Sequence, residues 1–153
     1  MDAAERWDEA IPRLPDRPGR VLRWIADERS RLERIRLIPD RSKQLVERMA
    51  RLAEDKLARD IVILDMDSVV GYTDYFLICS GNTTRQTQAI ADEIELRLKR
   101  EDGLLPHRAE GKQDGTWILL DYLDVVVHVF TPEARAFYRL EQLWGQVPAR
   151  QFA

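Results

Sequence analysis

The stretch that decides the fold is WILLDYLDVVVHVF, residues 117–130. Two apolar runs, residues 117–120 and 125–130, flank a short polar segment, and the second run is rich in valine, which favours strands. Both runs are apolar at successive rather than alternating positions, which is typical of strands that are covered on both faces. The stretch therefore predicts two paired strands, joined around residues 121–124, with both faces in need of cover.

The segments before this stretch predict two helices and two strands. Apolar side chains recur at helical spacing in residues 42–57. Residues 61–64 and 75–79 are short apolar runs bounded by polar turns, as expected of buried strands. Thr83, followed three residues later by Gln86, has the capping-box pattern that opens a helix.

The segments around and after the strand pair complete the pattern. A short strand is predicted near residues 105–109, ahead of the pair. Thr131 followed by Pro132 is a strong helix start, because the hydroxyl caps the first turn and proline suits the first helical position. One side of this last helix is expected to carry its apolar residues, Phe137, Leu140 and Trp144.

From residue 42 the predicted order is helix, strand, strand, helix, strand, strand, strand, helix. This order indicates an α/β fold with a mixed sheet of about five strands and flanking helices. Residues 1–40 contain four prolines and an Arg-rich stretch, and we interpret them as a partly helical N-terminal extension whose function is not readable. The domain is expected to cover residues 41–147, and residues 148–153 are expected to form a C-terminal tail.

Composition argues against several classes of protein. The chain has 153 residues, 44% of them hydrophobic and 33% charged, which suits one domain with a real core. No apolar run approaches the roughly 18–20 residues that span a bilayer. The single cysteine, Cys79, excludes an intramolecular disulfide, and the two histidines, His107 and His128, offer few metal ligands. We expect a cytoplasmic protein without a membrane partner, a metal or a cofactor.

The net charge of −3 is unevenly distributed along the chain. Residues 1–60 hold 15 Lys and Arg against 13 Asp and Glu, whereas residues 61–153 hold 9 against 14. The C-terminal part is therefore mildly acidic and lacks the clustered cations with which proteins grip a nucleic-acid backbone. A basic protein partner fits it better, although an ordinary solvated surface explains the same charges.

One pattern is compatible with catalysis. Asp65 and Asp67 follow a predicted strand, and two carboxylates one residue apart can hold Mg²⁺, as nucleotidyl transfer requires. The turn that follows the next strand, Ser80, Gly81 and Asn82, precedes a helix and could cradle a phosphate. Loop acids and a turn glycine account for the same residues. A metal-dependent nucleotidyltransferase is therefore the alternative to a non-enzymatic binding protein.

A second pattern indicates a docking surface at the strand pair and its turn. Tryptophan and tyrosine are favoured at interfaces, because they combine a large apolar area with a polar group. The residues alone leave the question open, since the tryptophan equally fits the core and the two aspartates equally fit a role in shaping the turn. The cluster consists of Trp117, Asp121, Tyr122, Leu123 and Asp124.

Several segments in the same order resemble the ribosomal silencing factor family, also called Iojap-like. The resemblance covers roughly residues 42–147 and leaves the N-terminal extension outside. The matching segments are KLARDIVILD (56–65), TDYFLICS (73–80), GNTTRQTQAIA (81–91), EG (110–111), WILLDYLDVVVHVF (117–130) and RAFYRLEQLW (135–144).

This resemblance implies an α/β fold related to the nucleotidyltransferases but without known catalysis. It also implies binding to the large ribosomal subunit through ribosomal protein uL14, at the face where the small subunit docks. Such binding blocks subunit joining and lowers translation, notably in starvation or stationary phase. Links to large-subunit maturation and homodimers belong to the same family picture. Any rRNA contact is expected to be secondary, through an Arg-rich stretch that includes Arg29, Arg31, Arg34, Arg36 and Arg41.

Carried over by motif, the partner-binding surface of the family falls on residues 117–128, with weaker candidates on the last helix. Many family members have a glycine where this chain has Leu123, so the turn here is bulkier. The expected partner-binding residues are Trp117, Asp121, Tyr122, Leu123, Asp124, His128, Arg135, Tyr138 and Glu141.

Overall fold

The computed structural model describes residues 39–69 and 73–152. Most of the predicted N-terminal extension lies outside the described residues, and with it the arginines at positions 29, 31, 34 and 36 that were considered for an rRNA contact. The remaining arginine of that stretch, Arg41, is exposed on the first described helix.

A parallel pair of strands, β2 with β5, lies in the middle of a six-stranded sheet with the order β3-β4-β5-β2-β1-β6. Every other neighbouring pair in this sheet of the described residues is antiparallel. The predicted α/β fold with a mixed sheet is therefore confirmed. The strands are β1 (Arg59–Asp65), β2 (Tyr75–Ser80), β3 (Arg108–Glu110), β4 (Trp117–Asp121), β5 (Val125–Phe130) and β6 (Ala149–Gln151).

Strand β6 raises the strand number above the expected five and lies in the segment that was expected to be a tail. Its three residues pair with β1 and are all exposed, so the sequence carries no apolar run there that could predict a strand. The tail segment thus contributes an edge strand to the sheet.

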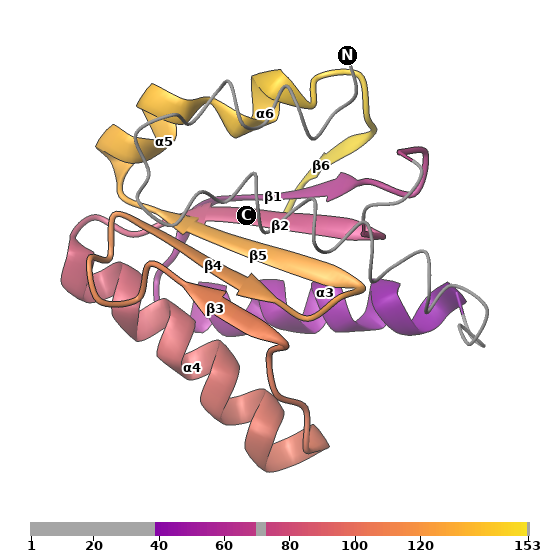
Figure 1. Cartoon of the computed structure of the whole chain (residues 1–153), viewed down its shortest axis with the longest axis horizontal. Coiled ribbons are helices and arrows are strands. Elements are labelled where there is room, and N and C mark those ends of the chain that lie inside the picture. The colour runs from indigo at the N-terminus through magenta and orange to yellow at the C-terminus, as the bar shows by residue number, and fades with distance from the viewer. Residues whose placement is uncertain (1–38, 70–72, 153) are drawn as a thin grey trace.

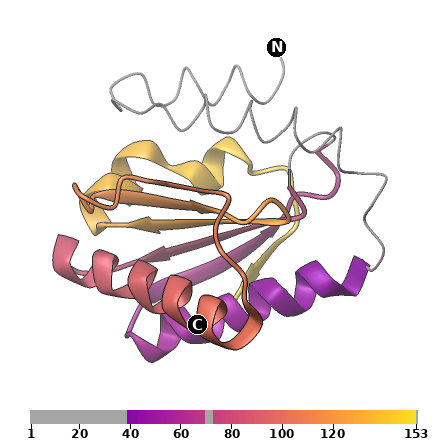
Figure 2. The ribbon, with the colours of Figure 1, turned by 60° about the horizontal axis from the view of Figure 1, so that its bottom comes forward.

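Two pairs of helices cover the two faces of the sheet (Figures 1 and 2). On one face lie α3 (Pro39–Asp55) and α4 (Thr84–Asp102), and on the other lie α5 (Pro132–Tyr138) and α6 (Leu140–Leu143). The predicted start of α4 is confirmed, because the Thr83 hydroxyl accepts a hydrogen bond from the Gln86 backbone N–H at 3.1 Å. None of the described helices is long and apolar enough to cross a membrane.

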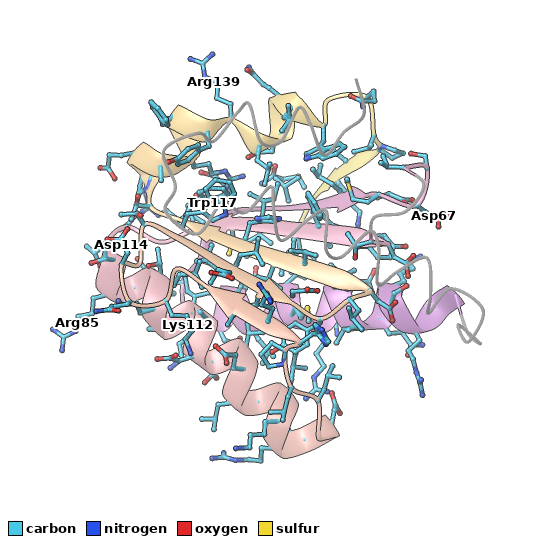
Figure 3. The ribbon with its side chains drawn as sticks, viewed as in Figure 1. Asp67, Arg85, Lys112, Asp114, Trp117 and Arg139 are labelled. Atoms are coloured by element: carbon cyan, nitrogen blue, oxygen red, sulfur yellow. The ribbon has the colours of Figure 1, made fainter. Side chains whose placement is uncertain are left out.

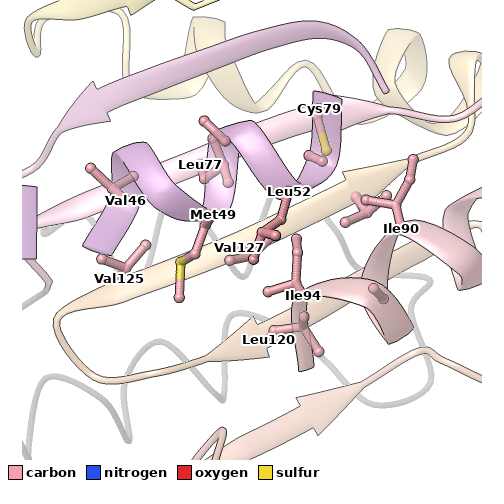
Figure 4. Close-up of a cluster of buried hydrophobic side chains, with 14 of the residues drawn as sticks. Val46, Met49, Leu52, Leu77, Cys79, Ile90, Ile94, Leu120, Val125 and Val127 are labelled. Atoms are coloured by element: carbon pink, nitrogen blue, oxygen red, sulfur yellow. The ribbon is translucent and has the colours of Figure 1, made fainter. Parts of the chain in front are cut away.

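The alternating side chains of the central strands form two cores, as the successive apolar positions of β4 and β5 predicted. On β5, Val125, Val127 and Val129 face α3 and α4, whereas Val126 and Phe130 face α5 and α6. Figure 4 shows the first core, where Met49 and Leu52 of α3 and Ile94 of α4 meet the strands. Burial on both faces fixes the register of β5, because a shift by one residue would exchange its two sets of side chains.

The last predicted helix is broken in two, and this corrects the expected position of Phe137. Arg139 adopts a left-handed backbone conformation, with φ of 48°, and separates α5 from α6. The break turns Leu140 and Trp144 into the core, where both are 1% exposed, but leaves Phe137 62% exposed. The expectation that these three side chains lie on one side of a single helix assumed an unbroken helical period and was wrong for Phe137.

The turn between β4 and β5 requires a left-handed residue. Leu123 has φ of 69°, in the region that favours glycine. The Asp121 carboxylate accepts a hydrogen bond from the Leu123 N–H at 2.8 Å, and the Leu123 carbonyl accepts one from the Thr73 hydroxyl at 2.7 Å. A glycine would adopt this backbone without strain, as the resemblance implied for this position, and leucine adopts it at a cost.

Replacing Leu123 with glycine should raise the free energy of unfolding by about 0.5–1 kcal/mol. Relief of a left-handed non-glycine residue contributes roughly 1–2 kcal/mol, and the greater freedom of glycine in the unfolded chain offsets part of it. Urea unfolding measures the difference. Leu105→Gly is the control, because Leu105 is a loop leucine that is 60% exposed and has no positive φ, and this substitution should lower stability. A Leu123→Gly variant destabilised as much as this control would contradict the interpretation.

Candidate functional site

Seven of the nine expected partner-binding residues lie in two groups at opposite ends of β5, and the other two, Trp117 and His128, lie on β4 and β5. The turn group, residues 121–124, precedes β5, and the helix group on α5 and α6 follows it. The six residues of β5 separate the groups by about 20 Å, at roughly 3.3 Å per residue. Trp117 pairs with Phe130 and lies at the helix-group end, beneath α5 (Figure 3). The helix group consists of Arg135, Tyr138 and Glu141.

Four of the nine side chains are buried. Trp117 is 4% exposed and Tyr122 is 6% exposed, while Asp121 and His128 have no exposed surface. Leu123, Asp124, Arg135, Tyr138 and Glu141 are partly exposed. A buried side chain can support a docking surface from beneath, whereas direct contact with a partner falls to the partly exposed ones.

Trp117 and His128 form a hydrogen-bonded aromatic support beneath α5. The Trp117 Nε1–H donates to His128 Nδ1 at 3.1 Å, so the imidazole is neutral and carries its proton on Nε2. Burial lowers the pKa of His128 to about 3, so that the ring stays uncharged at physiological pH. Tyr138 lies against Trp117 from the α5 side, with ring centroids 4.7 Å apart. This stack fixes the position of α5 relative to the sheet.

Asp121 shapes the turn from inside the protein. One of its carboxylate oxygens accepts the Leu123 N–H, and the other, Oδ2, is buried without a donor in the described part of the chain. Burial raises the pKa of Asp121 to about 6, and the Leu123 N–H, His107 and Arg108 oppose this shift. The next residue, Tyr122, is buried beside α3 and α4, and burial also raises its pKa. The turn group therefore presents Leu123 and Asp124 outward on a buried base.

The helix group combines a fixed ion pair with exposed aromatic surface. Arg135 donates two hydrogen bonds to the Glu141 carboxylate, both at 3.1 Å, and a third to the Ser80 hydroxyl at 2.8 Å. Phe137 stands beside Tyr138 in an edge-to-face arrangement, with ring centroids 4.9 Å apart. Phe137 was not among the expected partner-binding residues, because helical spacing grouped it with Leu140 and Trp144 on one side of the last helix. Only the break at Arg139 reveals it as a surface residue.

The residues behind the nucleotidyltransferase alternative lie at opposite ends of the sheet. β1 and β2 are antiparallel, so that Arg59 pairs with Ser80 and Asp65 pairs with Tyr75. Asp65 and Asp67 are therefore about 20 Å from the turn that was considered as a phosphate cradle, and Figure 3 shows Asp67 at the far end of the sheet from Trp117. Within the described residues, no group of three His, Cys, Asp or Glu side chains could hold a metal ion.

Local structure accounts for each of these motifs without a substrate. Asp65 Oδ1 accepts the Asp67 backbone N–H at 3.1 Å and so shapes the turn after β1. Gly81 packs tightly on α4, because a Cβ atom there would come within 2.9 Å of the Thr87 backbone nitrogen. The structure does not bring the two halves of the proposed catalytic site together.

Comparison with known proteins identifies the family to which the chain belongs. The model of the family described as "Ribosomal silencing factor during starvation" matches residues 39–152. The ribosomal silencing factor of Bacillus subtilis is 44% identical over 106 residues, which are 69% of this chain and 89% of that protein. The chain belongs to the ribosomal silencing factor family. The resemblance found in the sequence is thereby confirmed, and it extends through β6.

Other relatives of this family member span bacteria and a plant. A chloroplastic Iojap protein of Arabidopsis thaliana is 30% identical over 145 residues, covering 94% of this chain and 59% of that protein. A crystal structure of a Bacillus halodurans protein, 39% identical, matches with a TM-score of 0.63 over 72% of this chain and 99% of that one. The α/β fold described above is therefore also the fold of a solved relative.

Burial of Asp121 should make the folding stability of this protein depend on pH in a measurable way. Its pKa in the folded state, about 6, lies above the ordinary value of an aspartate, so as the pH falls the folded state binds the proton at a higher pH than the unfolded chain does. The contribution of Asp121 to stability therefore rises as the pH falls from 6 towards 4, by up to about 1.4 kcal/mol per pH unit. Urea unfolding of the wild type and Asp121→Asn, compared across this range, should show this difference. The exposed Asp55→Asn serves as the control, and parallel curves for all three proteins would refute the assignment.

Proposed function

We propose that this chain binds the large ribosomal subunit through ribosomal protein uL14 and sterically blocks joining of the small subunit. Membership of the ribosomal silencing factor family is the observation that carries this proposal. The action requires no catalytic residue, because a bound protein that occupies the joining face excludes the other subunit by its bulk. Because fewer subunits can join, translation is lowered in starvation or stationary phase.

The surface that we assign to docking is the α5 surface, defined as Arg135, Phe137, Tyr138 and Glu141 with Trp117 beneath them. Phe137 supplies exposed apolar area at 62% exposure, and the Tyr138–Trp117 stack holds the helix beneath it. Exposed aromatics on a rigid base are typical binding hot spots, because little side-chain freedom is lost when a partner covers them. The buried Trp117–His128 hydrogen bond makes the base rigid.

The turn group supplies a second candidate contact at the other end of β5, where Tyr122 and Asp124 lie towards α3 and α4. A standard interface covers about 800 Å² per partner, which corresponds to a patch roughly 30 Å across. The separation of about 20 Å along β5 is smaller than this width, so one partner that reaches around the end of the sheet could contact both groups. The acidic balance of residues 61–153 suits a basic ribosomal protein, since complementary charge increases the association rate and the specificity.

Replacing Phe137 with alanine should weaken binding to isolated large subunits by tenfold or more. Truncation of a hot-spot aromatic costs more than about 1.4 kcal/mol of binding, whereas removal of a largely exposed ring leaves folding stability nearly unchanged. Co-sedimentation of the protein with large subunits at increasing concentration measures the affinity, and urea unfolding checks the fold.

Leu105→Ala is the matched control, because Leu105 is 60% exposed and lies in the loop after α4, away from α5. The control should bind like the wild type. Equal affinities for the wild type, Phe137→Ala and Leu105→Ala would place the docking surface elsewhere. A wild-type protein that does not sediment with large subunits at all would overturn the proposed function.

A further inference from the structure

A cavity of about 490 Å³ opens at the carboxyl ends of β2 and β5. Segments far apart in the sequence form its walls: the start of β1, the turn after β2, and the helices α5 and α6. The docking proposal uses only its α5 and α6 rim. Its polar and charged lining residues are Arg59, Asp60, Ser80, Asn82, Arg135, Arg139, Glu141 and Gln142.

The topology of the sheet places the cavity there. β2 and β5 are parallel neighbours, but β2 continues into α4 on one face of the sheet and β5 continues into α5 on the opposite face (Figure 1). The chain leaves the two adjacent strand ends in opposite directions, so a crevice opens between the connections. In open α/β sheets, ligands bind in this kind of crevice, outside the carboxyl ends of the strands.

Three arginines give the cavity a positively charged lining. Arg59 reaches it from β1, where it pairs with Ser80, and Arg135 and Arg139 reach it from α5 and the residue that follows. Arg135 is held by Ser80 and Glu141, and its side chain is only 13% exposed. Arg59 and Arg139 are exposed at the rim. Asp60 and Glu141 supply two negative charges against these three positive ones, which leaves the lining with a net positive charge.

The start of α4 adds to this positive character. α4 has 19 residues and no acidic side chain in its first turn, and Asn82 of the cavity lies two residues before its first residue. The N-terminus of a helix carries a partial positive charge, which favours an anion nearby. The guanidinium group of arginine matches the geometry of phosphate oxygens and binds them in pairs.

We propose that this cavity binds a phosphate group, with Arg59 and Arg139 contacting its oxygens and the Arg135–Ser80 pair forming the floor. The volume lies within the range of small-molecule sites, about 300–1,000 Å³, so it can also hold part of the group that carries the phosphate. The phosphate has two possible sources, a free phosphate compound or the backbone of ribosomal RNA. The site does not depend on the docking proposal, since it can be tested on the isolated protein.

Calorimetric titration of the full chain at low salt tests the site with two probes, sodium pyrophosphate and a uridine hexanucleotide. The test variant is Arg59→Gln/Arg139→Gln, which removes two rim charges and leaves the Arg135 contacts in place. The control variant is Arg51→Gln/Arg100→Gln, which removes two charges from exposed positions on α3 and α4. The urea midpoint of each variant checks that it is folded.

Whichever probe binds the wild type should bind the cavity variant, Arg59→Gln/Arg139→Gln, at least tenfold more weakly. The affinity of the control variant for that probe should stay within twofold of the wild-type affinity. Pyrophosphate binding that is lost in the cavity variant supports a site for free phosphate compounds. Hexanucleotide binding alone, lost in the same variant, supports a contact to ribosomal RNA. Failure of both probes to bind the wild type, or an equal loss in the control variant, would overturn the proposal.

Discussion

The parallel pairing of β2 with β5 is the constraint on which the rest of the structure depends. It joins two hairpin-like halves, β1 with β2 and β4 with β5, into one sheet, and it buries both faces of its two strands. Because the two strands are parallel, the connections that follow them leave from the same end of the sheet. The connection after β2 leads to α4 on one face, and the connection after β5 leads to α5 on the other. The α5 surface and the arginine-lined cavity are both consequences of this one pairing.

The two ends of the sheet, where β2 and β5 begin and where they end, differ in the charge of their side chains. Asp65, Asp74 and Asp121 all lie at the end of the sheet where β2 and β5 begin, and Asp65, Asp74 and Asp67 add to burial in raising the pKa of Tyr75. At the end where these strands finish, Arg59 and Arg135 line the same cavity, and Arg135 donates a hydrogen bond to Ser80. The acidic end of the sheet and its arginine-lined end are therefore separated by about the length of one strand.

Much of the fold could be predicted because local signals and tertiary packing agree. The successive apolar positions of β5 predicted burial on both faces, and Thr83 with Gln86 predicted the start of α4. The break at Arg139 could not be predicted, since a left-handed arginine carries no local sequence signal. Phe137 was therefore grouped with Leu140 and Trp144 on one side of the helix, although the structure exposes Phe137 and buries the other two. Strand β6 was missed because its pairing with β1 is made entirely by tertiary contact.

The candidate site was harder to predict than the fold, because its geometry depends on segments that are distant in the sequence. Proximity along the chain suggested that Trp117 and residues 121–124 would form one patch, but the length of β4 places them at opposite ends of the sheet. The same reasoning joined Asp65 with Ser80 in a catalytic hypothesis, which the antiparallel register of β1 and β2 separates. The meeting of Arg59 with Arg135 depends on that register and on the course of β5 into α5, and neither is visible in the residues themselves.

The central claim is that this protein acts by obstruction, and subunit joining tests it most directly. Purified large subunits of a bacterium with a close family member, such as Bacillus subtilis, are incubated with increasing amounts of the protein before small subunits are added, and joined particles are resolved on a sucrose gradient. The account predicts that the joined fraction falls with dose and reaches its minimum near one protein per large subunit. An unchanged joined fraction at a large excess of protein would contradict it.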